Sequence, residues 1–241
     1  MTAALFWGLL SSAALFLGQW LAGPLGRSER AIGLMMGFGG GTLLAAVAYE
    51  LIPESTISDG WQVIASAMVG ALTYYVADRL VDRRGGEARV AVGTGRGEGG
   101  SGTAMFLGAL LDGIPEAFIL GLGLALGGKI SLAFLAAIFV SNIPQGLAGT
   151  TSLQEAGTPG RRITAMWGLL TIACGVASLL GYLVADHLAH VGTYASAFAG
   201  GAVLMMLADS MIPESYRHGG RTVGLLTVVG FLVAGVLTVL Q

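Results

Sequence analysis

Long apolar stretches separated by short polar segments run through the chain from end to end. Eight of them reach about 20 residues, the length that an α-helix needs to cross a bilayer. They predict an all-α fold, a polytopic membrane protein with one transmembrane domain over residues 1–241 and a flexible cytoplasmic linker at 83–102. The predicted helices are 3–22, 31–52, 61–81, 103–126, 130–152, 163–185, 192–212 and 221–240.

Four of these apolar segments contain Ile-Pro followed by Glu or Gln and then a small residue. The copies begin at Ile52, Ile114, Ile143 and Ile212. Proline removes one backbone N–H from a helix and displaces the carbonyl four residues earlier, and an unmatched carboxylate in hydrocarbon is costly. The repeated combination predicts a kinked, polar centre that binds something cationic.

Composition supports a membrane protein. Hydrophobic residues make up 54% of the chain, charged residues only 11%, and the mean hydropathy is +0.77. The single cysteine, Cys174, excludes a disulfide framework and a multi-cysteine metal site. A net charge of −2 gives no sign of a nucleic-acid partner, so the expected surroundings are the lipid bilayer.

The basic residues predict the orientation of the helices. Eleven of the twelve follow the first, third, fifth or seventh predicted helix, and only Lys129 lies on the other side. By the positive-inside rule these loops are cytoplasmic and both termini lie outside. All four tryptophans stand near predicted helix ends, as an interfacial belt would require. The expected location is the plasma (inner) membrane.

The order of the motifs predicts an internal repeat. The second predicted helix ends outside with residues 49–55, and the seventh ends inside with residues 209–215. The fourth and fifth run in opposite directions and carry their copies in mid-helix. We therefore expect an inverted repeat, with helices 1–3 mirrored by 6–8 around the central pair 4–5.

Polar residues of the central pair have the spacing of a cation site. Asp112 and Glu116 lie four residues apart, and Asn142 and Gln145 three apart, so each pair shares one helix face. With Ser141 they could offer about six oxygens to one divalent ion, as hard cations prefer. Compared with a site containing histidine, this set favours manganese, iron(II) or magnesium over zinc.

These features resemble the ZIP (Zrt-, Irt-like) family of divalent metal transporters. Family members typically carry His-Asn-x-Pro-Glu-Gly on the fourth span. Here Asp112 takes the place of the histidine, Glu116 matches the glutamate, and Gly113 stands where the family has an asparagine ligand. On the fifth span, Asn142 and Gln145 occupy positions that are often acidic.

The second and seventh predicted helices extend the resemblance. Glu50 replaces the histidine of the family's His-x-x-Pro, and Asp209 is shifted by one position from its Asp-Met-x-Pro-Glu. The resemblance implies a secondary transporter, not an enzyme, that moves zinc, iron, manganese or a similar ion into the cytoplasm without a cofactor. It also implies that spans 1, 4, 5 and 6 move as a unit against the rest within a homodimer.

Other interpretations of the same residues remain open. The two carboxylates could stabilise packing, and the two amides could join helices. Glu54 and Glu214 are each equally a solvated helix end or a gate, whereas Glu50 and Asp209 lie deeper and are expected to line the pathway. Asp186, His187 and His190 cluster outside and could collect metal, but a solvated loop is expected there. Cys174 is expected to be a packing residue.

Two other functions fit the whole chain less well. Gln145, where the family often has an acid, favours a degenerate relative that carries another solute or protons, or that transports no metal. An intramembrane metal-dependent hydrolase would need a histidine-rich site, and all three histidines lie outside the predicted helices or at their ends.

Overall fold

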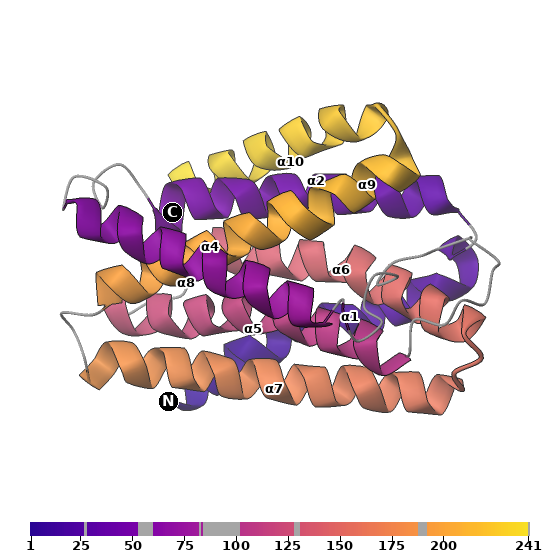
Figure 1. Ribbon diagram of the computed structural model, residues 1–241, viewed down its shortest axis with the longest axis horizontal. Helices are drawn as coiled ribbons and strands as arrows, with labels where there is room; N and C mark the ends of the chain where they lie inside the picture. Colours follow the sequence, from indigo (N-terminus) through magenta and orange to yellow (C-terminus); the bar gives the residue numbers. More distant parts are fainter. Residues whose placement is uncertain are drawn as a thin grey trace.

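The computed structural model describes residues 1–26, 28–52, 60–81, 83, 102–127, 131–187 and 192–240, and within these ranges the secondary structure is entirely helical. The helices run roughly alongside one another, and the two chain ends lie at the same end of the bundle (Figure 1). In chain order the elements are α1 (Thr2–Leu25), α2 (Glu29–Ala46), η1 (Val47–Leu51), α4 (Trp61–Val81), α5 (Gly102–Gly127), α6 (Leu132–Glu155), α7 (Gly160–His187), α8 (Gly192–Met206), η4 (Leu207–Met211), α9 (Ile212–Gly219) and α10 (Thr222–Val239).

All eight predicted helices correspond to helical segments of this structure. Among the described residues, seven of these segments are long and apolar enough to cross a membrane, which confirms an integral membrane protein. The other is α4, which has 21 residues but includes Tyr74, Asp78 and Arg79. Its helical structure is confirmed, and its crossing of the membrane stays a prediction. The predicted linker lies almost wholly outside the described residues, as do Arg27, Lys129 and His190.

The helices pack in two groups. In one, α1 packs on α6 and α7, and α5 packs on α7. In the other, α4 packs on α8, and α10 packs on α2. For reference we call α1, α5, α6 and α7 the α5 group and the other described helices the α4 group. Within the α4 group, the α4–α8 pair and the α2–α10 pair meet through η1 and η4. Contacts of α2 with α6 and of α5 with α8 join the two groups.

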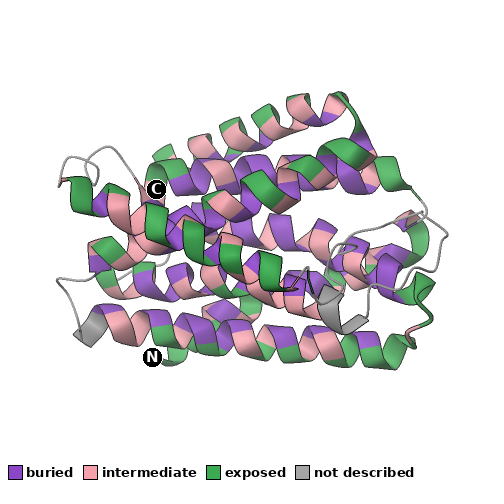
Figure 2. Cartoon of the chain, in the orientation of Figure 1, coloured by how far each residue is buried: buried purple, intermediate pink, exposed green. Residues whose placement is uncertain are grey.

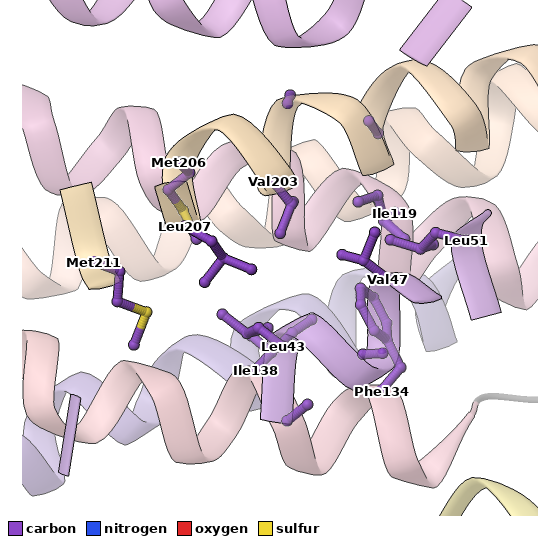
Figure 3. Packing of buried hydrophobic residues seen from close by; sticks show 14 of the residues in the cluster. Leu43, Val47, Leu51, Ile119, Phe134, Ile138, Val203, Met206, Leu207 and Met211 are labelled. Atoms are coloured by element: carbon purple, nitrogen blue, oxygen red, sulfur yellow. The ribbon is translucent and has the colours of Figure 1, made fainter. Parts of the chain in front are cut away.

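The buried core lies where α2, α5, α6 and α8 meet. Figure 3 shows Leu43 and Val47 of the α2–η1 segment close to Ile138 of α6, with Val203 and Met206 of α8 across from them. Outward faces of the peripheral helices are exposed instead (Figure 2). On α10 these faces carry large apolar residues, as expected where a helix contacts lipid.

The proline motifs have two different local structures. Pro115 and Pro144 lie inside uninterrupted α-helices, as predicted for the central pair. By contrast, the second and seventh segments each change to a π-helix just before the motif, at Val47–Leu51 and Leu207–Met211. The first motif beyond Ile52 lies outside the described residues. Pro213 falls in the first turn of α9, where a helix does not need its N–H.

Glycines allow α2 and α8 to touch a neighbouring backbone. A Cβ added at Gly41 would lie 2.0 Å from the carbonyl oxygen of Thr227 on α10, and one added at Gly201 would lie 1.9 Å from that of Ala67 on α4. Gly201 stands 160 positions after Gly41, and Thr227 stands 160 after Ala67. The two contacts are thus related by one constant shift along the chain.

A second pair of close contacts has the same spacing. A Cβ at Gly70 of α4 would lie 1.8 Å from the carbonyl oxygen of Phe198, and one at Gly230 of α10 would lie 2.1 Å from that of Phe38. Gly230 follows Gly70 by 160 positions, and Phe198 follows Phe38 by the same number. Small residues permit this backbone approach, which in membranes takes the place of a hydrophobic driving force.

Candidate metal site

Asp112 and Glu116 are buried one turn apart on α5. Their side chains are 7% and 1% exposed, in the part of the helix that contains Pro115. Spacing of four residues places them on one helix face, as predicted. Two buried carboxyl groups in a membrane-length helix are costly unless they are matched, so the surrounding groups decide what the pair can do.

The Asp112 carboxylate joins three helices. Its Oδ1 accepts a hydrogen bond from the hydroxyl of Tyr74 on α4. Its Oδ2 accepts one from Nε2 of Gln145 on α6, at 3.4 Å. The structure therefore brings Gln145 to Asp112 as predicted, although the amide presents its nitrogen rather than its oxygen.

The Glu116 carboxylate differs from that of Asp112. Neither of its oxygens has a hydrogen-bond partner among the described residues, although both are buried. Leaving a buried polar group unsatisfied costs about 1–3 kcal/mol, and more for a charged one. Such a group commonly marks a position that another species completes, and a carboxylate accepts a cation, a proton or a water molecule there.

The other predicted ligands of α6 have protein partners. The Asn142 amide donates from Nδ2 to the backbone carbonyl of Ser11 on α1, at 3.2 Å. The Ser141 hydroxyl donates to the carbonyl of Ile138 one turn earlier in its own helix, at 2.9 Å. Both side chains are buried, so their oxygens lie inside the bundle, but these bonds tie them to α1 and α6 rather than to Asp112.

Glu50 and Asp209 lie in the two π-helical segments. Thr238 of α10 donates to Glu50 Oε1 at 3.3 Å, and Ser131, just before α6, also hydrogen bonds to this carboxylate. Asp209 is exposed. Among the described residues, neither Glu50 nor Asp209 forms a hydrogen bond with Asp112 or with its partners Tyr74 and Gln145. π-Helical turns recur at functional sites. The role of Glu50 and Asp209 along a pathway stays a prediction.

Glu214 forms ion pairs within α9. Arg217 lies 2.7 Å from Glu214 Oε2, and Nε2 of His218 lies 2.7 Å from Oε1. His218 also lies 3.5 Å from Glu29 at the start of α2. The Glu214 side chain is 13% exposed, and its two interpretations, a solvated helix end and a gate, both stay predictions. Its counterpart Glu54 and the side chains of Asp186, His187 and His190 lie outside what the structure describes.

Sequence reasoning missed Tyr74. The tyrosine is 2% exposed and lies within α4. Its hydroxyl, in an otherwise apolar segment, could have indicated from the sequence that it has a polar partner in the interior. Cys174 of α7, predicted to be a packing residue, is indeed buried. It lies beside Gly113, and its thiol hydrogen bonds to Ser12.

Within the described residues, no three His, Cys, Asp or Glu side chains lie close enough together to hold a metal ion. Binding at this place would therefore combine Asp112 and Glu116 with amide, hydroxyl or carbonyl oxygens of α5 and α6. Comparison with known proteins matched no family model and no curated protein.

Proposed function

We propose that this chain is a secondary transporter of divalent metal cations, similar to the ZIP family, and that the ion passes between Asp112 and Glu116. The observation that carries the proposal is the pair of buried carboxyl groups one turn apart, one of which has no partner among the described residues. A divalent ion would supply the charge that the pair lacks, and Gln145, which lies beside Asp112, could add an oxygen after its amide turns. Asn142 shares the helix face of Gln145 and is the next amide that could contribute.

The membrane potential can drive such transport. One elementary charge crossing 100 mV gains about 2.3 kcal/mol, so a divalent cation gains about 4.6 kcal/mol on its way into the cytoplasm. Accumulation then needs no ATP hydrolysis. In this proposal both termini lie outside the inner membrane and the protein works as a homodimer, as the loop charges and the family resemblance lead us to expect.

We also propose eight membrane spans in an inverted repeat, with α1, α2 and α4 related to α7, α8 and α10. The constant spacing of 160 positions between matching glycine contacts supports it. The pairing of helices does so too, because α4 on α8 mirrors α10 on α2, and α5 on α7 mirrors α6 on α1. Transporters with such repeats place their substrate where the halves meet.

A second candidate is a degenerate relative that carries another solute or protons. The orientation of Gln145 favours it, because the amide donates its N–H to Asp112 instead of offering an oxygen. The two candidates differ in the charge that the site must balance. A divalent cation requires the carboxyl groups of both Asp112 and Glu116, whereas a proton or a neutral solute does not.

A flux assay in proteoliposomes tests the proposal. The purified chain should carry Mn²⁺, Fe²⁺ or Zn²⁺ into vesicles that enclose a metal-sensitive dye, and Asp112→Asn should abolish this flux. Glu155→Gln is the matched control, because it also removes one carboxylate but at an exposed helix end. If the wild type carries none of these ions faster than empty vesicles, or if Asp112→Asn carries them equally fast, the proposal is wrong.

A further inference from the structure

The hydrogen bond from Tyr74 to Asp112 crosses between the two groups of helices. Tyr74 belongs to the α4 group, and α4 packs on α8 far more extensively than on α5. Asp112 belongs to the α5 group. Two other interior hydrogen bonds, Thr238 to Glu50 and Asn142 to Ser11, each remain within one group, whereas the bond between Ser131 and Glu50 also crosses between the groups. The Tyr74 bond therefore ties the proposed ion site to the helices that do not carry it.

This bond also occupies the carboxylate that the ion would need. Oδ1 of Asp112 already accepts from the phenol and Oδ2 from Gln145, so the negative charge is shared with two donors. Hydrogen bonds to a charged group are stronger than those between neutral groups. A carboxylate oxygen can accept a hydrogen bond and bind a metal at the same time, so an ion competes with these donors only where it approaches from their side. On that side it has to displace a donor, and this cost lowers its apparent affinity.

The surroundings give the tyrosine ring room to move. An apolar pocket of about 360 Å³ adjoins Tyr74, and α4, α5 and α8 line it, with Leu111, Pro115 and Phe118 on the α5 side. A ring with free space beside it can leave its acceptor through side-chain rotation, without a shift of the packed backbone.

We propose that Tyr74 is a positioning residue that holds Asp112 toward α4, sets the ion affinity of the site, and releases the α5 group when an ion binds. This inference rests on the proposed function, since it assumes that Asp112 binds a divalent ion. It adds a residue on α4 that competes with the ion for the carboxylate. Ion binding and loosening of the two groups are then one event.

A purely structural role makes the opposite prediction. If Tyr74 only anchored Asp112 in the shape that binds the ion, removing its hydroxyl would weaken binding. If Tyr74 competes with the ion, removing the hydroxyl strengthens binding. The sign of the change in ion affinity therefore separates the two roles.

The experiment measures Mn²⁺ binding to the detergent-purified full chain, using the electron paramagnetic resonance signal of free Mn²⁺. Tyr74→Phe keeps the ring and removes the hydroxyl, and Kd should fall about tenfold, the factor that corresponds to one hydrogen bond of roughly 1.4 kcal/mol. Tyr75→Phe is the matched control: it makes the same change one residue away, where the ring lies against Arg79, and should leave Kd unchanged.

The wild type provides a second readout that does not depend on a variant folding. Mn²⁺ binding should change the near-ultraviolet absorption of a tyrosine, because the Tyr74 phenol loses its carboxylate acceptor. The change should persist in Tyr75→Phe and disappear in Tyr74→Phe. Absence of a spectral change while the wild type binds Mn²⁺ would overturn the inference.

The possible failures are distinguishable. If the wild type binds no Mn²⁺, or if Asp112→Asn binds it equally well, the proposed function fails and this inference fails with it. If Asp112→Asn abolishes binding but Tyr74→Phe leaves Kd unchanged or raises it, the ion site stands and only the role of Tyr74 is refuted.

Discussion

A Cβ added at Gly113 of α5 would lie 3.0 Å from the sulfur of Cys174 on α7. The thiol therefore takes the space into which a side chain at position 113 would point. In the ZIP-like interpretation, position 113 is where the family has an asparagine ligand. The close contact gives a physical reason for its absence, because asparagine and Cys174 compete for one volume.

Gly113→Asn should destabilise the protein, and Cys174→Ala should remove much of that penalty because it deletes the sulfur that the new side chain meets. The measurement is a double-mutant cycle on thermal unfolding in detergent. Residues in contact give coupling energies of about 0.5–3 kcal/mol. Strictly additive effects would show that the two positions do not share this space.

Glu116→Gln should abolish divalent transport and at the same time stabilise the fold. The substitution removes a buried charge whose oxygens have no hydrogen-bond partner among the described residues, a cost of about 1–3 kcal/mol or more. Thermal unfolding in a metal chelator measures the stability, with Glu155→Gln as the control for loss of an exposed carboxylate. A lower unfolding temperature for Glu116→Gln would mean that an unseen partner satisfies the group.

Gln145→Glu should tighten the binding of every divalent ion tested. It places a third carboxylate where the amide now donates to Asp112, so repulsion rises without an ion and attraction rises with one. Unfolding temperature should therefore fall in chelator and recover on addition of Mn²⁺. Gln19→Glu makes the same change on α1, where the amide donates to Thr164, and should show no Mn²⁺-dependent recovery.

Gly70→Ala and Gly230→Ala should destabilise the protein to a similar extent, by about 1–3 kcal/mol each, because each new methyl group meets a backbone carbonyl. Gly168→Ala on α7 is the control, since a Cβ there has no atom within 4 Å. Helix propensity alone would make all three changes slightly favourable. Thermal unfolding compares them, and a large effect at only one of the two contact glycines would argue against the proposed repeat.

Labelling of single cysteines tests the orientation in a Cys174→Ala background. Gln62→Cys at the start of α4 should react with a membrane-impermeant reagent in intact cells, because it is exposed and predicted to lie outside. Ala156→Cys between α6 and α7 is equally exposed but should be protected until the cells are opened. Labelling in the reverse order would invert the proposed topology.

Helix locations could be predicted from the sequence, because an apolar run of membrane length leaves the backbone few alternatives to a helix. The ends were less accurate. The helix expected at 163–185 begins at Gly160, since Arg161 and Arg162 can extend from its first turn into water. The helix expected to stop at residue 212 continues to Gly219, because the first turn of a helix such as α9 tolerates a proline, here Pro213.

The candidate site could be predicted only where its members share a helix. Spacing alone placed Asp112 beside Glu116, since four residues are about one turn. It could not place Tyr74 beside Asp112, or Asn142 beside Ser11, because both contacts depend on how helices that are apolar on every side rotate against each other. Such helices have no hydrophobic face from which that rotation could be read.

The two π-helical segments bear on the history of the chain. A π-turn contains one residue more than an α-turn, so it records an insertion that rotates everything after it by about 100°. Val47–Leu51 and Leu207–Met211 stand 160 positions apart, the same spacing as the glycine contacts. On the proposed repeat, a single ancestral three-helix unit already carried this insertion before its gene was duplicated. Glu50 and Asp209 fall at different positions within the two turns, so on the proposed repeat they are not equivalent residues.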